Sequence, residues 1–349
     1  MSGSDQQNVE VSALEREKIE KLGETARKIR GELDKKIVGM TDVVDKLLMA
    51  LFSGGHCLLV GVPGLAKTLL ISSLSEILSL KFRRIQFTPD LMPSDITGTE
   101  IIAQNAETGE RHFQFAPGPI FAHLVLADEI NRTPPKTQAA LLEAMEEHQV
   151  TSAGKRYPLE QPFYVLATQN PIEQEGTYPL AVAQLDRFMF EVRVSYPTFE
   201  EEYKIASMTT SGYQAKLEPL ISREEILELL QIVRKVEIGE DVLQYATRIA
   251  RATRAGAKGT PDFVKDWLTW GVGPRGGAFM ILAAKSRAML DGRARATAAD
   301  VRAVATPVLR HRLIPSYHAE AEGVTPEKIV ARLVEAVESP DGKREMAAV

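Results

Sequence analysis

The chain of 349 residues has a single cysteine, Cys57, and only six histidines. An intramolecular disulfide needs two cysteines, so the class of small secreted domains held together by disulfides is excluded. The histidines are scattered and form no His-x-x-x-His pair, which leaves no recognisable zinc site. The chain is long enough for a packed core, and hydrophobic residues at 44% are close to the average of soluble globular proteins.

Long apolar runs and a strong charge of one sign are also missing. No run reaches the roughly 18 residues that a membrane-spanning helix needs. The start, Met-Ser-Gly-Ser-Asp-Gln-Gln-Asn, lacks the basic and apolar parts of a signal peptide. We therefore expect a cytoplasmic protein without a membrane span. The chain has 42 basic and 47 acidic residues, a net charge of −5, which disfavours a strongly basic nucleic-acid binder.

The pattern of apolar residues indicates two domains after a disordered tail at residues 1–10. In residues 11–195, helical segments alternate with short strand-like runs at 57–60, 83–87, 124–127 and 163–167. The last two runs are almost continuously apolar, as in a parallel sheet buried on both faces. The alternation predicts a doubly wound α/β domain that includes an N-terminal helix.

Residues 196–349 carry helix signals and few strand signals, so we expect an all-α second domain. Three positions have a hydroxyl residue followed three places later by an acid, the signature of a helix N-terminus. These pairs are Thr198 with Glu201, Ser222 with Glu225, and Thr297 with Asp300. Thr325-Pro326 predicts a further helix start, and Gly292 a helix end.

A glycine-rich segment, Gly61-Val-Pro-Gly-Leu-Ala-Lys-Thr68, lies between the first strand and an apolar helix. It matches the phosphate-binding pattern Gly-x4-Gly-Lys-Ser/Thr except that Ala66 replaces the second glycine. A Cβ is tolerated there if residue 66 has a negative φ. The amides of this loop can point at phosphate oxygens, Lys67 can reach the β- and γ-phosphates, and Thr68 can bind Mg²⁺. An ordinary Gly-Pro turn before a helix is the alternative.

Polar residues follow two later strands. Asp128 and Glu129 end an apolar run at the sheet edge where open α/β sheets bind ligands. Asp128 would hold the magnesium and Glu129 would orient or deprotonate the attacking water. Asn170 follows the next strand and could contact the γ-phosphate or that water. The alternative for the two acids is an acidic cap of the following helix, and the alternative for Asn170 is an ordinary Asn-Pro turn. The absence of an Asn-Lys-x-Asp motif favours ATP over GTP.

These segments together resemble the MoxR-type AAA+ ATPases over about residues 36–195. The resemblance is carried by residues 61–68, including the Ala before Lys, and by residues 87–98, 118–132, 134–146 and 184–188. The helical stretches 301–313 and 320–337 also fit this family. The joint match is far more specific than a lone phosphate-binding loop.

The resemblance implies a role for each matching residue. Lys67 and Thr68 correspond to Walker A, Asp128 and Glu129 to Walker B, Asn170 to sensor 1, Arg187 to the arginine finger and Arg275 to sensor 2. The nucleotide-binding set would be Val38, Gly39, Gly61, Pro63, Gly64, Leu65, Ala66, Lys67, Thr68, Leu69 and Asp128. Two departures from the family are Gly273, where a serine usually precedes Pro-Arg, and Met40, where a glutamine is more usual.

The function that the resemblance implies is ATP hydrolysis with Mg²⁺ in a hexameric ring. Such a ring would remodel or activate a protein client, with metal or cofactor insertion and a partner containing a von Willebrand factor A domain as expectations. Residues 99–115 and 150–157 read as hairpins similar to the helix-2 insert and pre-sensor-1 hairpin, which commonly face the pore. Two alternatives are a nucleotide-gated scaffold with little hydrolysis and a DNA-associated regulator using Lys155 and Arg156.

Overall fold

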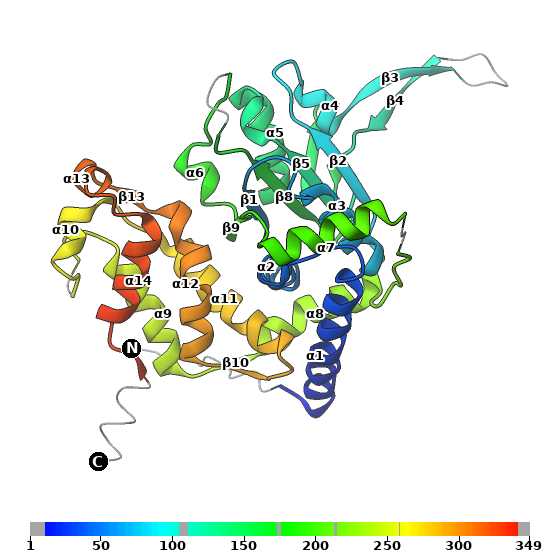
Figure 1. The fold of residues 1–349 in the computed structure, drawn as a ribbon. Coiled ribbons are helices and arrows are strands. Elements are labelled where there is room, and N and C mark those ends of the chain that lie inside the picture. Colours follow the sequence, from blue (N-terminus) through cyan, green and yellow to red (C-terminus); the bar gives the residue numbers. More distant parts are fainter. Residues whose placement is uncertain (1–10, 105–110, 173–175, 213–214, 258, 341–349) are drawn as a thin grey trace, which may run out of the picture. The chain divides into compact units, whose positions relative to one another are not determined.

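The structure is a computed structural model that describes residues 11–104, 111–172, 176–212, 215–257 and 259–340 (Figure 1). The predicted tail at 1–10 and the predicted turn at 105–109 lie outside these residues. Contacts divide the chain into two compact units. The sheet unit is Ile29–Leu227. The lid unit joins the segment before residue 29 to the segment from Glu228 onward.

A five-stranded parallel sheet in the order β2-β5-β8-β1-β9 forms the centre of the sheet unit. Its strands are β1 (Cys57–Val60), β2 (Phe82–Gln86), β5 (Leu124–Asp128), β8 (Tyr164–Gln169) and β9 (Phe190–Arg193). The predicted doubly wound α/β fold is confirmed. Four strands match the strand-like runs of the sequence, whereas β9 was not predicted. The carboxyl ends of the parallel strands share one edge of the sheet, so the residues after β1, β5 and β8 lie near one another.

Burial explains the apolar character of the central strands. The side chains of Leu124 through Ala127 on β5 are at most 1% exposed, and those of Val165 and Ala167 on β8 are fully buried. Both faces of these strands are therefore covered. The helices around this sheet are α2 (Thr41–Ser53), α3 (Lys67–Ile77), α4 (Pro93–Thr97), η1 (Ile130–Arg132), α5 (Pro135–Glu147), α6 (Val182–Leu185) and α7 (Phe199–Thr210).

Two antiparallel pairs interrupt the α/β alternation, where hairpins were expected. They are β3 (Gly98–Gln104) with β4 (Arg111–Pro117), and β6 (Gln149–Ser152) with β7 (Lys155–Pro158). The two pairs contact each other, because the Phe115 ring stacks on the Tyr157 ring with centroids 3.9 Å apart. Lys155 also lies 3.6 Å from the Glu100 carboxylate.

The lid unit is mostly helical, as expected, and also contains two short strand pairs. Its helices are α9 (Glu240–Ala252), α10 (Phe263–Trp267), α11 (Pro274–Leu290), α12 (Ala298–Leu309), η2 (Arg310–Arg312), α13 (Tyr317–Ala321) and α14 (Pro326–Ala336). The strand pairs are β10 (Glu237–Ile238) with β12 (Arg295–Ala296), and β11 (Leu268–Trp270) with β13 (Ile314–Pro315). Helices α1 (Ala13–Leu33) and α8 (Arg223–Lys235) run across the two unit boundaries.

The predicted helix ends are present. Thr198 Oγ1 accepts a hydrogen bond from the Glu201 amide at 3.3 Å, and the Glu201 carboxylate accepts from the Thr198 amide at 2.8 Å. Ser222 and Glu225 make the same reciprocal pair. Gly292 follows α11 with a φ of +75°, the left-handed conformation in which helices commonly end.

The boundary of the sheet unit falls at Leu227, later than the division at residues 195 and 196 expected from the sequence. Three hydrogen bonds tie the segment before α8 and the first residue of α8 to the rest of the sheet unit. The Glu218 amide donates to Glu32 Oε1 at 2.9 Å, and the Leu220 amide donates to the Ile77 carbonyl at 2.9 Å. Arg223 Nε donates to the Gln161 carbonyl at 2.7 Å.

Candidate functional site

The glycine-rich loop lies between β1 and α3, at the carboxyl edge of the sheet. Gly61 allows a close approach of two backbones, since a Cβ at this position would lie 2.6 Å from the Val194 carbonyl oxygen. Gly64 has a φ of +83°, in the left-handed region that favours glycine. Pro63 is exposed and Leu65 is buried. Both glycines are therefore required by the path of the loop.

Ala66 adopts a φ of +50°, so the condition of a negative φ, under which a Cβ would cost little, is not met at this position. The residue caps α3 in the left-handed conformation, and its carbonyl accepts the first helical hydrogen bond from Leu70 at 2.9 Å. A left-handed L-residue costs roughly 1–2 kcal/mol because its Cβ crowds the following carbonyl oxygen. The loop geometry therefore overrides the local preference of alanine.

Lys67 and Thr68 are the first two residues of α3. The Lys67 Nζ donates to the Gly61 carbonyl at 2.6 Å, across the loop. Burial lowers the pKa of the Lys67 ammonium, while the charges of Asp128 and Glu129 act in the opposite direction. Lys67 therefore lies close enough to both acids to interact with them. Within the described part of the chain, the Thr68 hydroxyl makes no hydrogen bond.

Asp128 is the last residue of β5 and Glu129 follows it, as the sequence predicted, and β8 is the neighbouring strand. Asp128 Oδ1 accepts a hydrogen bond from the Thr168 hydroxyl at 2.6 Å, and the Glu129 amide donates to that hydroxyl at 2.8 Å. Glu129 has a φ of +58°, which is uncommon for a residue with a side chain. Such conformations are retained where surrounding contacts hold them, frequently at functional sites.

Three further side chains contact the acids, and sequence reasoning did not identify them. Arg84 Nε and Nη2 donate to Asp128 Oδ2 at 3.0 and 2.7 Å. Gln86 Nε2 and Arg132 Nη1 donate to Glu129 Oε2 at 2.8 and 3.0 Å. The available signal was strand alternation, because residues 84 and 86 share one face of a strand. Only the strand order places that strand next to β5.

Asn170 directly follows β8 and is 5% exposed. Its Oδ1 accepts a hydrogen bond from the Ile172 amide at 3.1 Å. Among the described residues, its side-chain nitrogen has no hydrogen-bond partner. The carbonyl end is thus held, and the amide nitrogen can donate to a ligand at the carboxyl edge of the sheet.

The two candidate arginines lie in different units. Arg187 follows α6 in the sheet unit, where Nε and Nη2 donate to Glu146 Oε2 on α5 at 2.8 and 2.7 Å. Its Nη1 donates to the Ala183 carbonyl at 3.1 Å. Arg275 is the second residue of α11 in the lid unit and is exposed. The roles expected for both residues remain predictions.

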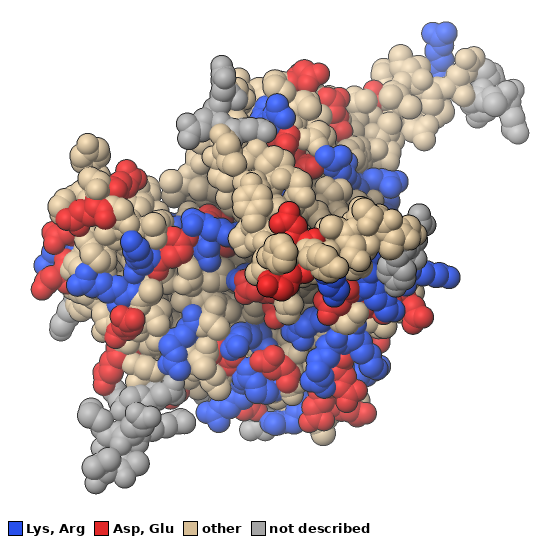
Figure 2. Space-filling view, viewed as in Figure 1, with Lys and Arg blue, Asp and Glu red and all other residues tan. Residues whose placement is uncertain are grey.

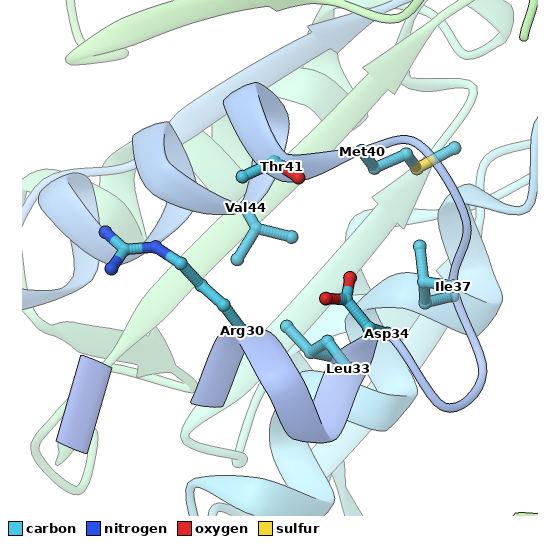
Figure 3. A pocket seen from close by; sticks show the side chains of 7 residues that line it. All are labelled: Arg30, Leu33, Asp34, Ile37, Met40, Thr41 and Val44. Atoms are coloured by element: carbon cyan, nitrogen blue, oxygen red, sulfur yellow. The ribbon is translucent and has the colours of Figure 1, made fainter. Parts of the chain in front are cut away.

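The expected adenine-side segment is the turn before α2. Gly39 has a φ of +76°, and a Cβ there would overlap the Glu201 carboxylate, 2.3 Å from Oε1. A hollow beside this turn has a volume of about 10 Å³, the space of one water molecule rather than of an adenine ring. Figure 3 shows its lining residues, which are Arg30, Leu33, Asp34, Ile37, Met40, Thr41 and Val44. Val38 and Gly39 remain predicted adenine neighbours.

Thr68 and Asp128 fit a magnesium ion by their chemistry, since hydroxyl and carboxylate oxygens are the ligands that Mg²⁺ prefers. The described residues contain no group of three or more His, Cys, Asp or Glu side chains arranged to hold a metal by themselves. An ion at this edge would therefore complete its coordination with phosphate oxygens and water, as is usual for Mg²⁺ bound with a nucleotide.

The parallel sheet, the glycine-rich loop after β1 and the acids after β5 define a P-loop protein of the nucleotide-binding class. Residues 56–190 match the family described as ATPase family associated with various cellular activities (AAA), and residues 263–333 match the AAA lid domain.

Across the described residues, we find no helix of the length and apolarity that a bilayer crossing requires.

Relatives identify the family more closely. The chain is 42% identical to chaperone MoxR1 of Mycobacterium tuberculosis over 310 residues, which cover 88% of this chain and 81% of the relative. It is 28% identical to protein MoxR of Methylorubrum extorquens, with coverage of 91% and 96%. A crystal structure from Cytophaga hutchinsonii matches with a TM-score of 0.86, 39% identity and coverage of 92% and 97%. The chain belongs to the MoxR family of AAA+ ATPases.

Proposed function

We propose that this protein hydrolyses ATP to ADP and phosphate at the edge formed by the glycine-rich loop and the two acids. The observation that carries the proposal is the position of Glu129. It directly follows Asp128 at the end of β5, and both carboxylates interact with the Lys67 ammonium of the loop. A cation for the phosphates and a base for water are thereby assembled at one place.

The loop binds the triphosphate in this proposal. Backbone amides from Gly64 to Thr68, at the N-terminus of α3, are suited to phosphate oxygens. Lys67 exchanges its bond to the Gly61 carbonyl for the β- and γ-phosphates. Thr68 and Asp128 hold Mg²⁺, which neutralises charge on the phosphates when bound.

Glu129 activates the water that attacks the γ-phosphorus, while the bond from that phosphorus to the β–γ bridging oxygen breaks. The contacts of the side chain support this role. Gln86 and Arg132 both donate to Oε2, and among the described residues Oε1 has no hydrogen-bond partner. One oxygen is thus held while the other can accept a proton from water. Asn170 donates from its side-chain nitrogen to that water or to the γ-phosphate.

Two arginines complete the site by stabilising charge at the γ-phosphate. In the proposal, Arg275 reaches the nucleotide of its own subunit from the lid. Arg187 reaches the nucleotide of a neighbouring subunit, which requires a ring that we take to be a hexamer. Its guanidinium is held by Glu146, and the Arg187 side chain is 30% exposed, as a side chain acting on a second subunit must be.

The work of the ring is proposed to be the remodelling of a protein client. A relative at 42% identity is named a chaperone. The β3–β4 hairpin also offers an apolar surface, since the cross-strand neighbours Ile102 and Phe113 are 63% and 72% exposed. Figure 2 shows this hairpin largely without charged side chains. We further propose that this remodelling assists the insertion of a metal or cofactor, and that the ring acts with a partner that contains a von Willebrand factor A domain.

Neither alternative has comparable support. A scaffold with little hydrolysis does not need a base such as Glu129 beside the metal-binding acid. A DNA-associated regulator would use Lys155, whose ammonium is paired with Glu100 at 3.6 Å. Figure 2 also shows basic and acidic side chains interspersed over the surface around α1 rather than a basic stripe.

The Glu129→Gln variant tests the proposal. It should bind ATP as the unmodified protein does and release phosphate at least about 100-fold more slowly, since general-base catalysis contributes 10²–10⁴-fold. Glu143→Gln on the exposed face of α5 is the matched control. Unchanged hydrolysis in Glu129→Gln would refute the role of Glu129. Nucleotide binding without any phosphate release by the unmodified protein, with or without a client, would favour the scaffold.

A further inference from the structure

A basic side chain already binds the acid that is proposed to hold magnesium. Arg84 on β2 donates two hydrogen bonds, from Nε at 3.0 Å and Nη2 at 2.7 Å, to one oxygen of Asp128, Oδ2. The other oxygen, Oδ1, accepts from the Thr168 hydroxyl at 2.6 Å. Both carboxylate oxygens are therefore engaged by protein donors.

The sheet itself places Arg84 there. In the register between β2 and β5, Gln86 lies opposite Asp128, and Arg84 lies two residues earlier on the same face of β2. The Arg84 guanidinium also donates to Gln86 Oε1, which fixes its plane against the strand. The contact thus follows from strand pairing and does not depend on a flexible loop.

The two partners differ in exposure. The Asp128 side chain is 14% exposed, whereas the Arg84 side chain is 47% exposed. A carboxylate that is largely buried needs a nearby cation, but a half-exposed guanidinium can leave for water at little cost. Arg84 is therefore a replaceable counter-ion of Asp128.

We propose that Arg84 competes with the divalent cation for Asp128 and so raises the concentration of the cation that half-saturates the site. The inference rests on the proposed function, because it takes Asp128 as a metal-binding residue. Guanidinium and Mg²⁺ both seek the Oδ2 lone pairs and repel each other, so the ion binds Asp128 only as Arg84 moves away. Arg84 keeps the charge of Asp128 compensated until then, and its departure adds a cost to metal binding.

Metal affinity, measured apart from hydrolysis, tests this inference. Mn²⁺ is titrated into the full-length protein with saturating ADP or a non-hydrolysable ATP analogue, and free Mn²⁺ is followed by electron paramagnetic resonance. Arg84→Met retains an unbranched side chain and removes the charge. We expect the half-saturating Mn²⁺ concentration to fall about fivefold, the effect of about 1 kcal/mol for a half-exposed ion pair.

Two further variants give the measurement its controls. Arg84→Lys keeps a charge but loses the paired guanidinium donors. Its half-saturating Mn²⁺ concentration should therefore lie between those of the unmodified protein and Arg84→Met. Arg83→Met removes an adjacent exposed arginine on the opposite face of β2 and should leave the concentration unchanged. Circular dichroism verifies that each variant is folded, and Arg84→Lys carries the test if Arg84→Met does not fold.

The outcomes separate the two proposals. If the unmodified protein binds metal and nucleotide together but Arg84→Met needs as much Mn²⁺ or more, Arg84 does not compete and this inference is overturned. The inference also fails if Arg83→Met lowers the half-saturating concentration equally, because the effect would then be general electrostatics. If the unmodified protein binds no nucleotide and no Mn²⁺ with it, the proposed function itself fails.

Discussion

The Thr168 hydroxyl on β8 links the two neighbouring acids at the end of β5, donating to Asp128 Oδ1 and accepting from the amide of Glu129, the residue after the strand. A single side chain thereby fixes the orientation of the Asp128 carboxylate and the backbone at Glu129. The backbone bond supports the positive φ of Glu129, which turns that residue away from the path of the strand. Thr168 is 1% exposed, so water cannot replace these bonds if the hydroxyl is lost.

Replacing Thr168 with valine should therefore affect both stability and hydrolysis. We expect Thr168→Val to lower the free energy of unfolding by about 1–3 kcal/mol, because a buried backbone donor and a carboxylate oxygen lose their partner. Phosphate release should slow at least about tenfold through the displaced Glu129, with a smaller change in nucleotide affinity. Urea unfolding and steady-state phosphate release measure the two effects.

Thr133→Val is the matched control for this prediction. Thr133 is equally buried, and its hydroxyl has no hydrogen-bond partner among the described residues. Removing an unpaired buried hydroxyl should leave stability unchanged or raise it. Equal destabilisation by the two substitutions would show that the bonds of Thr168 to the acids are not what matters.

Arg187 provides a test of the ring. Arg187→Ala should retain ATP binding and lose hydrolysis, because the missing charge belongs to the neighbour's site. Mixing it with Glu129→Gln should restore phosphate release, since a Glu129→Gln subunit supplies the arginine and an Arg187→Ala subunit supplies the base. Release is measured against the mixing ratio. Inactivity at every ratio would argue against action between subunits.

The left-handed Ala66 gives a prediction on stability. Ala66→Gly should raise the free energy of unfolding by about 1 kcal/mol, because glycine adopts a φ of +50° without crowding and loses only part of this gain to chain entropy. Ala66→Val should lower it, since a β-branched side chain is poorly accommodated there. Thermal or urea unfolding distinguishes them. A valine variant as stable as the glycine variant would contradict the left-handed assignment.

His56 predicts a loss of stability in acid. Its Nδ1 accepts from the Val165 amide at 3.0 Å and its Nε2 faces the Met145 carbonyl at 3.3 Å, so the neutral ring satisfies both groups. Burial is the main reason that the pKa of His56 falls from its ordinary 6.5 to about 4. Between these values the unfolded chain binds more protons than the folded one, so stability decreases as the pH falls.

The shift of His56 corresponds to about 3 kcal/mol lost between pH 7 and pH 4. Urea unfolding at several pH values should show this loss of unfolding free energy in the unmodified protein. His56→Gln should be less stable at pH 7 but lose less of its stability on acidification. Parallel pH profiles for the two proteins would exclude His56 as the source.

The sequence by itself determined the α/β character of the first domain, the helical character of the second, and the positions of the loop and the two acids along the chain. These features are local: glycines permit a tight loop, continuous apolar runs form buried strands, and hydroxyl-acid pairs begin helices. The strand β9 was missed because its four residues, Phe190–Arg193, alternate too briefly to be distinguished from a loop. The positive φ of Ala66 does not follow from its sequence, because the loop and not the residue decides it.

Only the tertiary structure decided which side chains surround the acids. Arg84 and Thr168 lie 44 and 40 positions away from Asp128 along the chain, and no local pattern relates them. They meet because β5 lies between β2 and β8, so that both neighbouring strands present side chains to its carboxyl end. Strand order is set by burial of the whole sheet, a property of all its strands together that no single segment of the sequence encodes.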